Sequence, residues 1–417
     1  MQIPVPPVLE AIAQTLHRYH AKMVLVGGCV RDYFLHIPIK DYDIEVYGLK
    51  DLETLEEILS AFGKVKEVGK SFGILKLLHE GKEYDFAFPR LERKTGRGHR
   101  GFAVTVDGAL DFASAARRRD FTINAMGYII EEKRLLDPFG GREDLRSKIL
   151  RHIDDETFVE DPLRVLRGVQ FCARFDLAMH LDTLSLCREM VVSGMLHELP
   201  KERIFEEIRK LFLQARQPSK GFMLMQKMGA LALFPWLGEC DPQTLQRTLR
   251  RLDRTAESVR TWDEKERMAL SLAALSLEGG AKRAEEQVRF LSDEIRLRET
   301  VVRLVSSYPD ALQTARGIED VSVRKLSLRA PIRQLVVLLD ADGKTKEARR
   351  LEDAAKRLGV FEHAPAPLLQ GRDLVEKLKL SPSPKFKEIL DKVYEAQLEG
   401  RIASKDEALA YVKKELL

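Results

Sequence analysis

Two aspartates separated by one residue are the first side chains in this sequence whose spacing suggests chemistry. Asp41 and Asp43 lie in the run DYDIEVYG (41–48). On a strand, alternation would put both carboxylates on one face and Tyr42 on the other. Two carboxylates one pleat apart can share divalent cations, which a two-metal phosphoryl transfer uses to hold the attacking and leaving oxygens. The alternative is a solvated strand face without function.

A third carboxylate is usual in such a site, and KEYDFAFPR (82–90) offers one. Asp85 has apolar residues on both sides, so we expect it to lie deeper than Glu83, which shares its face and is the second choice. We therefore predict that Asp41, Asp43 and Asp85 are the catalytic, metal-binding residues. Carboxylate ligands suit Mg²⁺, so we expect Mg²⁺ in a two-metal site.

A glycine turn stands shortly before the aspartates. The apolar run VLV (24–26) leads into Gly27 and Gly28, and CVRDYFL (29–35) can begin a helix. Glycines at a strand-to-helix junction let backbone N–H groups approach an anion, and a helix N-terminus favours phosphate. Arg31 could clamp that phosphate with its guanidinium. The turn and the carboxylates together favour nucleotide chemistry over a solvated strand.

The elements that must position these residues follow two patterns. Short apolar stretches punctuated by glycine, which are typical of strands, lie at 23–28, 42–48, 73–81 and 84–88, with a helical stretch at 52–63. Beyond about residue 140, apolar residues recur with helical spacing, as in 161–175, 200–215 and 242–260. We therefore predict an α+β fold, in which a small mixed or antiparallel sheet forms a head and the rest is helical.

Composition sets the broad class of protein. The chain has 417 residues with 44% hydrophobic and 32% charged, which indicates a soluble globular protein of about two to four domains. We expect no membrane span and no signal peptide, and hence a cytoplasmic protein. The four cysteines include no CxxC pair, which argues against a disulfide scaffold or a zinc ribbon. The net charge of +4 gives no sign of nucleic-acid binding by itself.

The glycine turn and the aspartates together resemble a known family. GGCVRD (27–32) followed by DYDIEVYG (41–48) is similar to the nucleotidyltransferase signature of the polymerase β superfamily. More narrowly, it resembles the class II CCA-adding tRNA nucleotidyltransferases and the related bacterial poly(A) polymerases. The resemblance implies a catalytic head (1–138), a helical neck with a nucleotide-selecting motif (139–200), a helical RNA-binding body (201–362) and a C-terminal helical tail module (363–417).

The segment RRRDFTINAMGY (117–128) resembles the second motif of this family, in which an Arg and an Asp contact the ribose and triphosphate. These residues would be Arg119 and Asp120, with Asn124 nearby. Without the family, the same run would be interpreted as a basic surface cluster before an apolar helix. The resemblance implies that Gly28, Arg31 and Arg119 position the triphosphate.

Base selection is implied for ETFVEDPLRVLRGVQFCARF (156–175), whose Glu160-Asp161-x-x-Arg164 matches the family's EDxxR motif. Cytosine and adenine both present an amino donor beside a ring-nitrogen acceptor, so one Asp and one Arg can pair with either base. Uracil and guanine present the opposite pattern. The resemblance therefore assigns base reading to Asp161 and Arg164, with Arg167 in support; the alternative is a helix cap followed by solvated arginines.

Two features bear on the range of the activity. Gln170 stands where family members often carry Arg, which leaves a third triphosphate contact open. The segment 89–108, whose first half is basic and Gly-rich, resembles by position the family's flexible loop, which is associated with the switch from C to A addition. Its full length favours an enzyme that adds A as well as C.

RNA binding is expected of the helix predicted at 246–260. Four arginines share one face of it: Arg247, Arg250, Arg251 and Arg254. The slice 201–260 holds twelve Lys and Arg against seven Asp and Glu, so it exceeds the net charge of the whole chain. Many such faces are only solvated, and that alternative stays open.

The function implied by the resemblance is template-independent addition of C, C and then A to the 3′ end of tRNA from CTP and ATP, with release of pyrophosphate. The alternatives are an A-adding or CC-adding tRNA nucleotidyltransferase or a poly(A) polymerase, and, less favoured, a non-catalytic RNA-binding homologue. The chain contains no His-Asp dipeptide, so we expect no metal-dependent phosphohydrolase activity of the kind that some family members carry. The sequence leaves the oligomeric state unknown.

Overall fold

A computed structural model describes residues 3–68, 73–94, 102–106 and 110–416 of the chain. The chain divides into two compact units. The first unit comprises Met1–Leu211 with Met223–Ala230, and the second comprises Phe212–Phe222 with Leu231–Leu417. The division into head, neck, body and tail at residues 138, 200 and 362 remains a prediction, because the two units cut the chain elsewhere.

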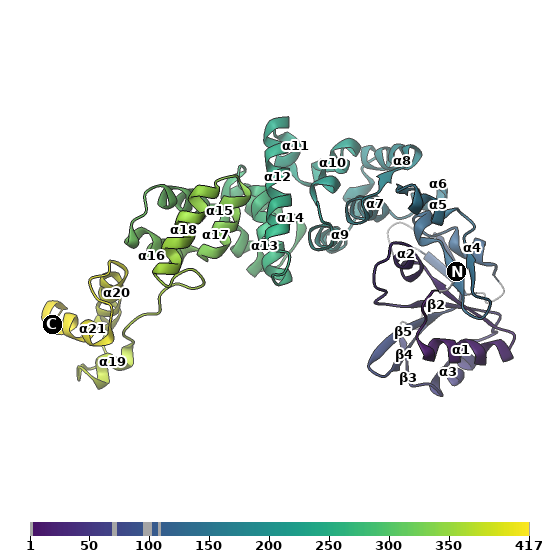
Figure 1. The fold of residues 1–417 in the computed structure, drawn as a ribbon, viewed down its shortest axis with the longest axis horizontal. Coiled ribbons are helices and arrows are strands. Elements are labelled where there is room, and N and C mark those ends of the chain that lie inside the picture. The colour runs from purple at the N-terminus through teal and green to yellow at the C-terminus, as the bar shows by residue number, and fades with distance from the viewer. Residues whose placement is uncertain (1–2, 69–72, 95–101, 107–109, 417) are drawn as a thin grey trace. The chain divides into compact units, whose positions relative to one another are not determined.

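A seven-stranded sheet forms the centre of the first unit (Figure 1). Its strands, in spatial order, are β3 (Lys64–Val68), β4 (Ile74–His79), β5 (Lys82–Ala87), β2 (Asp43–Tyr47), β1 (Lys22–Val26), β8 (Gly127–Ile129) and β9 (Arg134–Leu136). β2 and β5 run parallel, and the other neighbouring pairs are antiparallel. The mixed sheet confirms the predicted head architecture.

The alternation predicted for the carboxylate strand is confirmed. Ile44 and Val46 of β2 are fully buried, whereas Asp43 is exposed and Glu45 is half-buried. Because the apolar face of β2 packs into the core, its acidic face must point away from it. The helices α1 (Pro7–Arg18) and α3 (Leu52–Ser60) pack on the same sheet through contacts with β1 and β4.

The remaining elements of the first unit are mostly short. They are α2 (Gly28–Phe34), the hairpin of β6 (Arg90–Lys94) and β7 (Phe102–Val106), α4 (Phe112–Ala116), η1 (Thr122–Asn124), α5 (Gly141–Arg146), β10 (Ile149–Leu150), α6 (Asp155–Phe158), α7 (Leu163–Phe175), β11 (Ala178–Met179), α8 (Leu181–Val192) and η2 (Met195–Glu198). Two helices, α9 (Lys201–Gln214) and α10 (Ser219–Met228), run from one unit into the other.

The second unit is helical throughout the residues that the structure describes. Its elements are η3 (Ala230–Leu233), α11 (Pro235–Glu239), α12 (Pro242–Ser258), α13 (Glu264–Ser276), α14 (Gly280–Leu291), α15 (Ile295–Arg316), α16 (Asp320–Arg329), α17 (Ile332–Ala341), α18 (Thr345–Arg357), α19 (Gly371–Glu376), α20 (Lys385–Leu398), α21 (Lys405–Tyr411) and the π-helical turn η4 (Val412–Leu416). The helical spacing at 161–175, 200–215 and 242–260 is confirmed by α7, α9 and α12.

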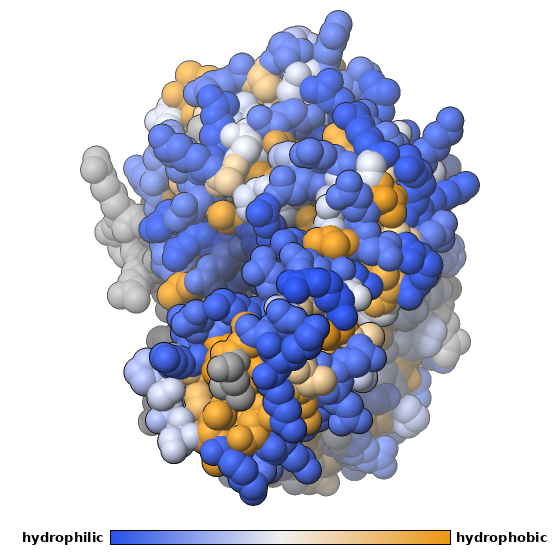
Figure 2. Space-filling view, turned by 90° about the vertical axis from the view of Figure 1, so that its left-hand side faces the viewer, coloured by the Kyte–Doolittle hydropathy of each residue, from blue (hydrophilic) through white to orange (hydrophobic). Residues whose placement is uncertain are grey.

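The last helices of the second unit have a small core of their own. Leu374, Val393 and Ala408 are fully buried in it, one from each of α19, α20 and α21. Figure 2 views the side that Figure 1 draws at its left, where these helices lie, and shows hydrophobic residues gathered low on a mostly hydrophilic face. None of the described helices is long and apolar enough to cross a bilayer.

The four cysteines are all free thiols, and three of them are buried. Burial raises the pKa of Cys29 and that of Cys187 to about 12 each. Burial also raises the pKa of Cys172 and, less strongly, that of the partly exposed Cys240.

Candidate active site

The residues predicted to bind nucleotide line one pocket of about 460 Å³ in the first unit. All eight are present: Gly28, Arg31, Arg119, Asp120, Asn124, Asp161, Arg164 and Arg167. Gly27, Asp43, Leu163 and Arg203 complete the lining. Five guanidinium groups face three carboxylates in this pocket, so it carries a net positive charge that suits a polyanion such as a triphosphate.

The glycine turn forms one wall of this pocket, between β1 and α2. Gly27 has a φ of 69°, in the left-handed region that favours glycine. A Cβ at Gly27 would lie 2.8 Å from Arg119 Nη1, so any larger residue would displace that guanidinium. The turn is therefore shaped for close approach of an arginine and, with it, of an anionic ligand.

Arg119 is held over the turn by β2. Its Nη2 donates to Glu45 Oε1 at 2.8 Å, and its Nη1 donates to the Asn124 carbonyl oxygen at 3.3 Å. Glu45 in turn accepts a hydrogen bond of 2.6 Å from the Tyr47 hydroxyl. Glu45 and Tyr47 carry no pattern of their own that marks them as site residues, although alternation places Glu45 on the acidic face of β2.

A largely buried hydrogen-bond network connects four more residues of the pocket. Asp120 accepts hydrogen bonds from Arg167 Nε at 2.7 Å and from Asn124 Nδ2 at 2.9 Å, and Arg31 Nη1 donates to Asn124 Oδ1 at 2.7 Å. Burial alone would raise the pKa of Asp120, but Arg167 and Asn124 hold that pKa below its usual range. The Arg31 guanidinium also lies over the ring of Phe175. Four predicted residues thus form one connected unit.

The two residues of the base-selecting motif are anchored from different elements. Arg164 donates to the carbonyl oxygens of Thr157 and Arg118, at 2.8 and 2.6 Å. Asp161 accepts from Leu163 N at 3.1 Å and from Arg203 Nη2 at 2.9 Å. The helix α7 begins at Leu163, one residue later than a cap at Asp161 would give.

Arg203 is the pocket residue that sequence reasoning missed. It lies on α9 and reaches Asp161 across 42 positions of the chain. Its segment, KERIFEEIRK, has the alternating charges of a solvated helix, so no local pattern distinguishes it. Gln170, by contrast, is buried, does not line the pocket, and has a side-chain oxygen without a hydrogen-bond partner.

The predicted metal ligands are only partly brought together. Asp43 and Asp85 are register partners on the parallel strands β2 and β5, and Asp41 precedes β2. Lys76 Nζ lies 3.1 Å from Asp85 Oδ1 and 3.2 Å from Glu83 Oε2. Among the described residues, no three carboxylate, imidazole or thiol side chains form a ready metal-binding group.

Electrostatics distinguish Asp43 among the acidic residues. Its side chain is accessible in the pocket, but the surrounding protein displaces water and raises its pKa. The negative charges of Asp85, Asp41 and Glu45 raise this pKa further, while Arg119 opposes them. A cation beside Asp43 would relieve this repulsion.

The predicted RNA-binding arginines lie on α12, and one of them requires a correction. Arg247, Arg250 and Arg254 are exposed, but the Arg251 side chain is only 2% exposed and forms ion pairs with Glu278 and Asp342. Steps of three and four along a helix sweep across its surface, so Arg251 falls on the core side. Part of the predicted flexible loop at 89–108 lies outside the described residues, which omit 95–101 and 107–109.

Three family models match consecutive parts of the chain. Residues 23–151 match the "Poly A polymerase head domain", 176–239 match the "Probable RNA and SrmB-binding site of polymerase A", and 249–412 match tRNA nucleotidyltransferase domain 2. The CCA-adding enzyme of Coxiella burnetii is 40% identical over 218 residues, which are 52% of this chain and 55% of the relative. The multifunctional CCA protein of Laribacter hongkongensis is 41% identical over 211 residues, 51% of this chain and 49% of the relative.

The chain thus spans about half the length of the curated relatives that it matches. Solved structures match over nearly the whole chain. A CCA-adding enzyme in apo form I has a TM-score of 0.76 at 23% identity, covering 99% of this chain and 95% of its own. The Thermotoga maritima CCA-adding enzyme complexed with tRNA has a TM-score of 0.69 at 22% identity, covering 99% and 97%. These structures establish the shared fold.

The mixed sheet, the glycine turn and the acidic strand β2 lie in the part of the chain that matches the poly(A) polymerase head domain, and helices follow it. The chain belongs to the family of class II CCA-adding tRNA nucleotidyltransferases and bacterial poly(A) polymerases.

Proposed function

We propose that this protein is a template-independent tRNA nucleotidyltransferase that adds C, C and A to the 3′ end of tRNA from CTP and ATP. The observation that carries this proposal is the convergence of all eight predicted nucleotide-binding residues on one positively charged pocket beside Asp43. The 3′ hydroxyl of tRNA would attack the α-phosphate in line and release pyrophosphate. A tRNA substrate implies a cytoplasmic location.

Different residues of the pocket would bind the triphosphate and the base of the nucleotide. Gly28, Arg31 and Arg119 would bind the triphosphate, since the guanidiniums of both arginines are already fixed by Asn124. Asp161 would accept from the amino group of cytosine or adenine. Arg164 would donate to the ring nitrogen beside it.

Discrimination between bases follows from the fixed positions of the side chains that would read them. Arg203 and the Leu163 amide hold Asp161, and two backbone carbonyls hold Arg164. Because neither side chain can reorient freely, uracil or guanine would leave polar groups unpaired, at about 1–3 kcal/mol for each mismatched group. Arg167 would support the site by keeping Asp120 ionised and in place.

The acidic residues fit a divalent cation. Asp43 carries a pKa raised by desolvation and by neighbouring carboxylates, and Asp85 is its register partner on the parallel strand β5, where Lys76 Nζ now stands at the Asp85 carboxylate. Mg²⁺ is typically bound by one or two carboxylates together with substrate phosphates, so a complete set of protein ligands is not required. We propose that Asp43 and Asp85, with Asp41, hold Mg²⁺. The metal would lower the pKa of the attacking hydroxyl and offset the charge that develops at the phosphate.

The range of products is tested with three tRNAs, lacking CCA, ending in C and ending in CC, each with CTP and with ATP separately. We expect CTP incorporation on the first two and addition of a single A on the third. Incorporation of ATP only, and only on the CC-ending tRNA, would instead identify an A-adding enzyme. CTP incorporation without any ATP incorporation would identify a CC-adding enzyme, and a long A tail a poly(A) polymerase.

The catalytic residues are tested by Asp43→Asn and Asp85→Asn, with Glu83→Gln as the matched control on the same strand as Asp85. Loss of a metal ligand removes several kcal/mol of transition-state stabilisation, so we expect kcat to fall at least about 100-fold in both aspartate variants. The Glu83 side chain is 61% exposed, and we expect its variant to retain nearly full activity. If Glu83→Gln lost activity and Asp85→Asn retained it, Glu83 would be the metal ligand in place of Asp85. Unchanged extension by Asp43→Asn would refute the metal assignment.

A further inference from the structure

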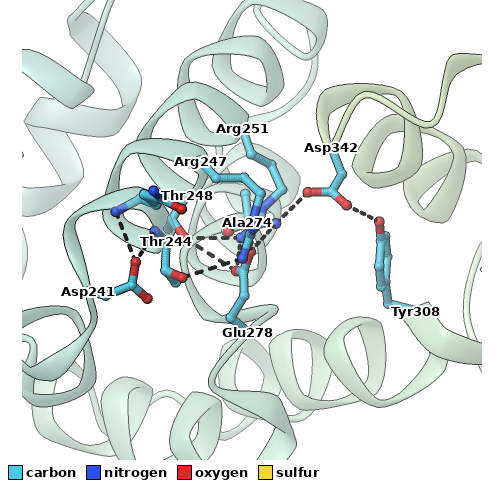
Figure 3. Close-up of polar contacts among 10 residues, drawn as sticks. Asp241, Thr244, Arg247, Thr248, Arg251, Ala274, Glu278, Tyr308 and Asp342 are labelled. Carbon is cyan, nitrogen blue, oxygen red and sulfur yellow. Dashed lines mark hydrogen bonds and ion pairs between the residues drawn. The ribbon is translucent and has the colours of Figure 1, made fainter.

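A second pocket, of about 480 Å³, is built entirely from residues of the second unit along α12. Figure 3 shows the polar contacts that Arg247 and Arg251 of this helix make with Glu278 and Asp342. The pocket is lined by the arginines Arg247, Arg250, Arg251 and Arg254 and by the amides of Gln243 and Gln246, with the end of α17 opposite. We call it the α12 pocket. The first turns of α12 fall between two family matches, since one match ends at residue 239 and the next begins at residue 249.

The buried Arg251 forms the floor of the α12 pocket and has no donor left for a ligand. Its Nε donates to the Ala274 carbonyl oxygen at 2.8 Å. Its Nη1 donates to Glu278 at 3.0 Å and to Asp342 at 2.6 Å, and its Nη2 donates to Glu278 and to Thr248 Oγ1. A guanidinium has five N–H groups, and all five are used here. Arg251 therefore joins α12 to α13 and α17 instead of binding RNA.

The two carboxylates beside Arg251 are also fully engaged. Glu278 accepts a further hydrogen bond of 3.0 Å from Arg247 Nε, and Asp342 accepts one of 2.7 Å from the Tyr308 hydroxyl. Burial alone would raise the pKa of Glu278, but Arg251 and Arg247 hold that pKa below its usual range. The negative charges of these two carboxylates therefore balance the positive charges of Arg251 and Arg247.

Arg250 and Arg254 contribute the charge that this network does not balance. Arg250 donates to the neutral Gln246 side chain at 2.7 Å, and Arg254 donates to the Ala341 carbonyl oxygen at 3.4 Å. The two arginines stand four residues apart on one face of α12, where like charges repel. An anion between them would relieve that repulsion, and the fork of a guanidinium matches phosphate oxygens.

We propose that the α12 pocket is a phosphate-binding site formed by Arg250 and Arg254, and that it takes a backbone phosphate of bound RNA. The choice of RNA rests on the proposed function. The same chemistry would accept a free phosphate, and the experiment below separates the two sources. Gln243 and Gln246 add neutral donors at the edge of the site.

The test compares the double variant Arg250→Gln/Arg254→Gln with the control Arg289→Gln/Arg357→Gln in the full chain. The control also removes two exposed helix arginines, 60% and 57% exposed, but each of these pairs with a carboxylate. The Kd of a labelled tRNA lacking CCA is measured without nucleotide, between about 50 and 200 mM NaCl. We expect the double variant to bind about tenfold more weakly, with a slope of log Kd against log salt reduced by about one to two.

The control should keep the wild-type affinity and slope, and circular dichroism should show all variants folded. Calorimetric titration with inorganic phosphate and pyrophosphate forms the second arm. Loss of their binding with unchanged RNA affinity would overturn the RNA assignment, and no change in either arm would refute the site. The binding assay contains no nucleotide, so its result does not depend on catalysis. Failure of the proposed function would appear in the separate extension assay, as wild-type protein that binds tRNA but does not extend it.

Discussion

At the scale of single residues, the active site depends on side chains that hold other side chains. Glu45 holds Arg119 together with the Asn124 carbonyl, and Arg203 holds Asp161 together with the Leu163 amide. Arg203 belongs to no motif, and Glu45 lies in the DYDIEVYG run without an assigned role; each reaches its arginine or aspartate across a long stretch of chain. The ligand-facing residues could therefore be predicted from the sequence, but the residues that position them could not.

We predict that Glu45→Gln raises the KM for CTP and ATP by about threefold to tenfold, because it replaces a charge-assisted hydrogen bond to Arg119, worth about 1.5–3 kcal/mol, with a neutral one worth about 0.5–1.5 kcal/mol. Tyr47→Phe should have a smaller effect in the same direction, since it acts through Glu45. Steady-state kinetics with saturating tRNA provides the measurement. A fall in KM would mean that Glu45 competes with the triphosphate for Arg119 and does not position it.

The buried pair of Asp120 and Arg167 predicts a pH-dependent stability. The pKa of Asp120 is lower in the folded protein than its usual value of 3.8, so the ionised form stabilises the fold above that pH. This contribution is lost as the pH falls through the folded pKa. Asp120→Asn should cost about 2–3 kcal/mol of unfolding free energy at pH 7, and the difference from wild type should shrink below about pH 4.

Denaturant unfolding at several pH values measures this difference. Asp51→Asn is the matched control, because Asp51 caps α3 at the surface and asparagine caps a helix equally well. It should change the unfolding free energy by less than about 0.5 kcal/mol. A loss in Asp120→Asn that is independent of pH would point to packing, and the ion pair would not be its cause.

At the scale of elements, the register of the sheet brings the acidic residues together. Asp43 faces Asp85 because β2 and β5 are parallel neighbours, although the two residues lie 42 positions apart in the chain. Alternation and apolar runs were enough to predict each strand and its acidic face. The parallel pairing of β2 with β5 could not be predicted, because strand order depends on how the whole sheet packs against α1 and α3.

The same limit applies to α12 at this scale. Helical spacing correctly predicted that α12 exists and that arginines cluster on one side. It could not predict that α13 and α17 would cover Arg251, because burial on a helix is decided by the neighbouring helices. A charged residue on the border of an amphipathic face can belong to either side.

One contact between elements is tight enough to predict a specific failure. A Cβ on Gly141, the first residue of α5, would lie 2.2 Å from the Thr122 carbonyl oxygen of η1. Gly141→Ala must therefore push α5 away from η1, which carries Asn124 of the pocket. We expect a loss of about 2–3 kcal/mol in unfolding free energy and weaker CTP binding.

Gly140→Asn serves as the control for this prediction. Gly140 has a φ of 74° and open space around its Cα, and asparagine tolerates this left-handed conformation. Its variant should lose less than about 1 kcal/mol and should bind CTP normally. Equal losses in the two variants would mean that the loop conformation matters and the contact with η1 does not.

At the scale of the whole molecule, the two compact units divide the proposed functions. The nucleotide pocket is lined only by residues of the first unit, and the α12 pocket only by residues of the second. The net charge of +4 gives no sign of this division between the two units, because ion pairs balance most charges locally. Both pockets are lined by more guanidinium groups than carboxylates.

We predict that scanning calorimetry resolves two transitions and that CTP shifts only one of them. At about 100 times its Kd, CTP should add about 2.7 kcal/mol to the stability of the first unit. The transition of the second unit should stay where it is. The assignment is checked with Gly141→Ala, which should lower only the transition that CTP raises. A single transition that CTP shifts as a whole would mean that the units unfold together.

The buried cysteines have a practical consequence for measuring motion in this protein. Thiolates, and not thiols, react with maleimides, and the raised pKa values of Cys29, Cys172 and Cys187 keep these residues protonated and enclosed. Only Cys240 is partly exposed. A Cys240→Ser protein should therefore be nearly silent to labelling. Two cysteines introduced on the surface, one in each unit, would then carry a pair of fluorophores that reports the separation of the units in solution as tRNA and CTP bind.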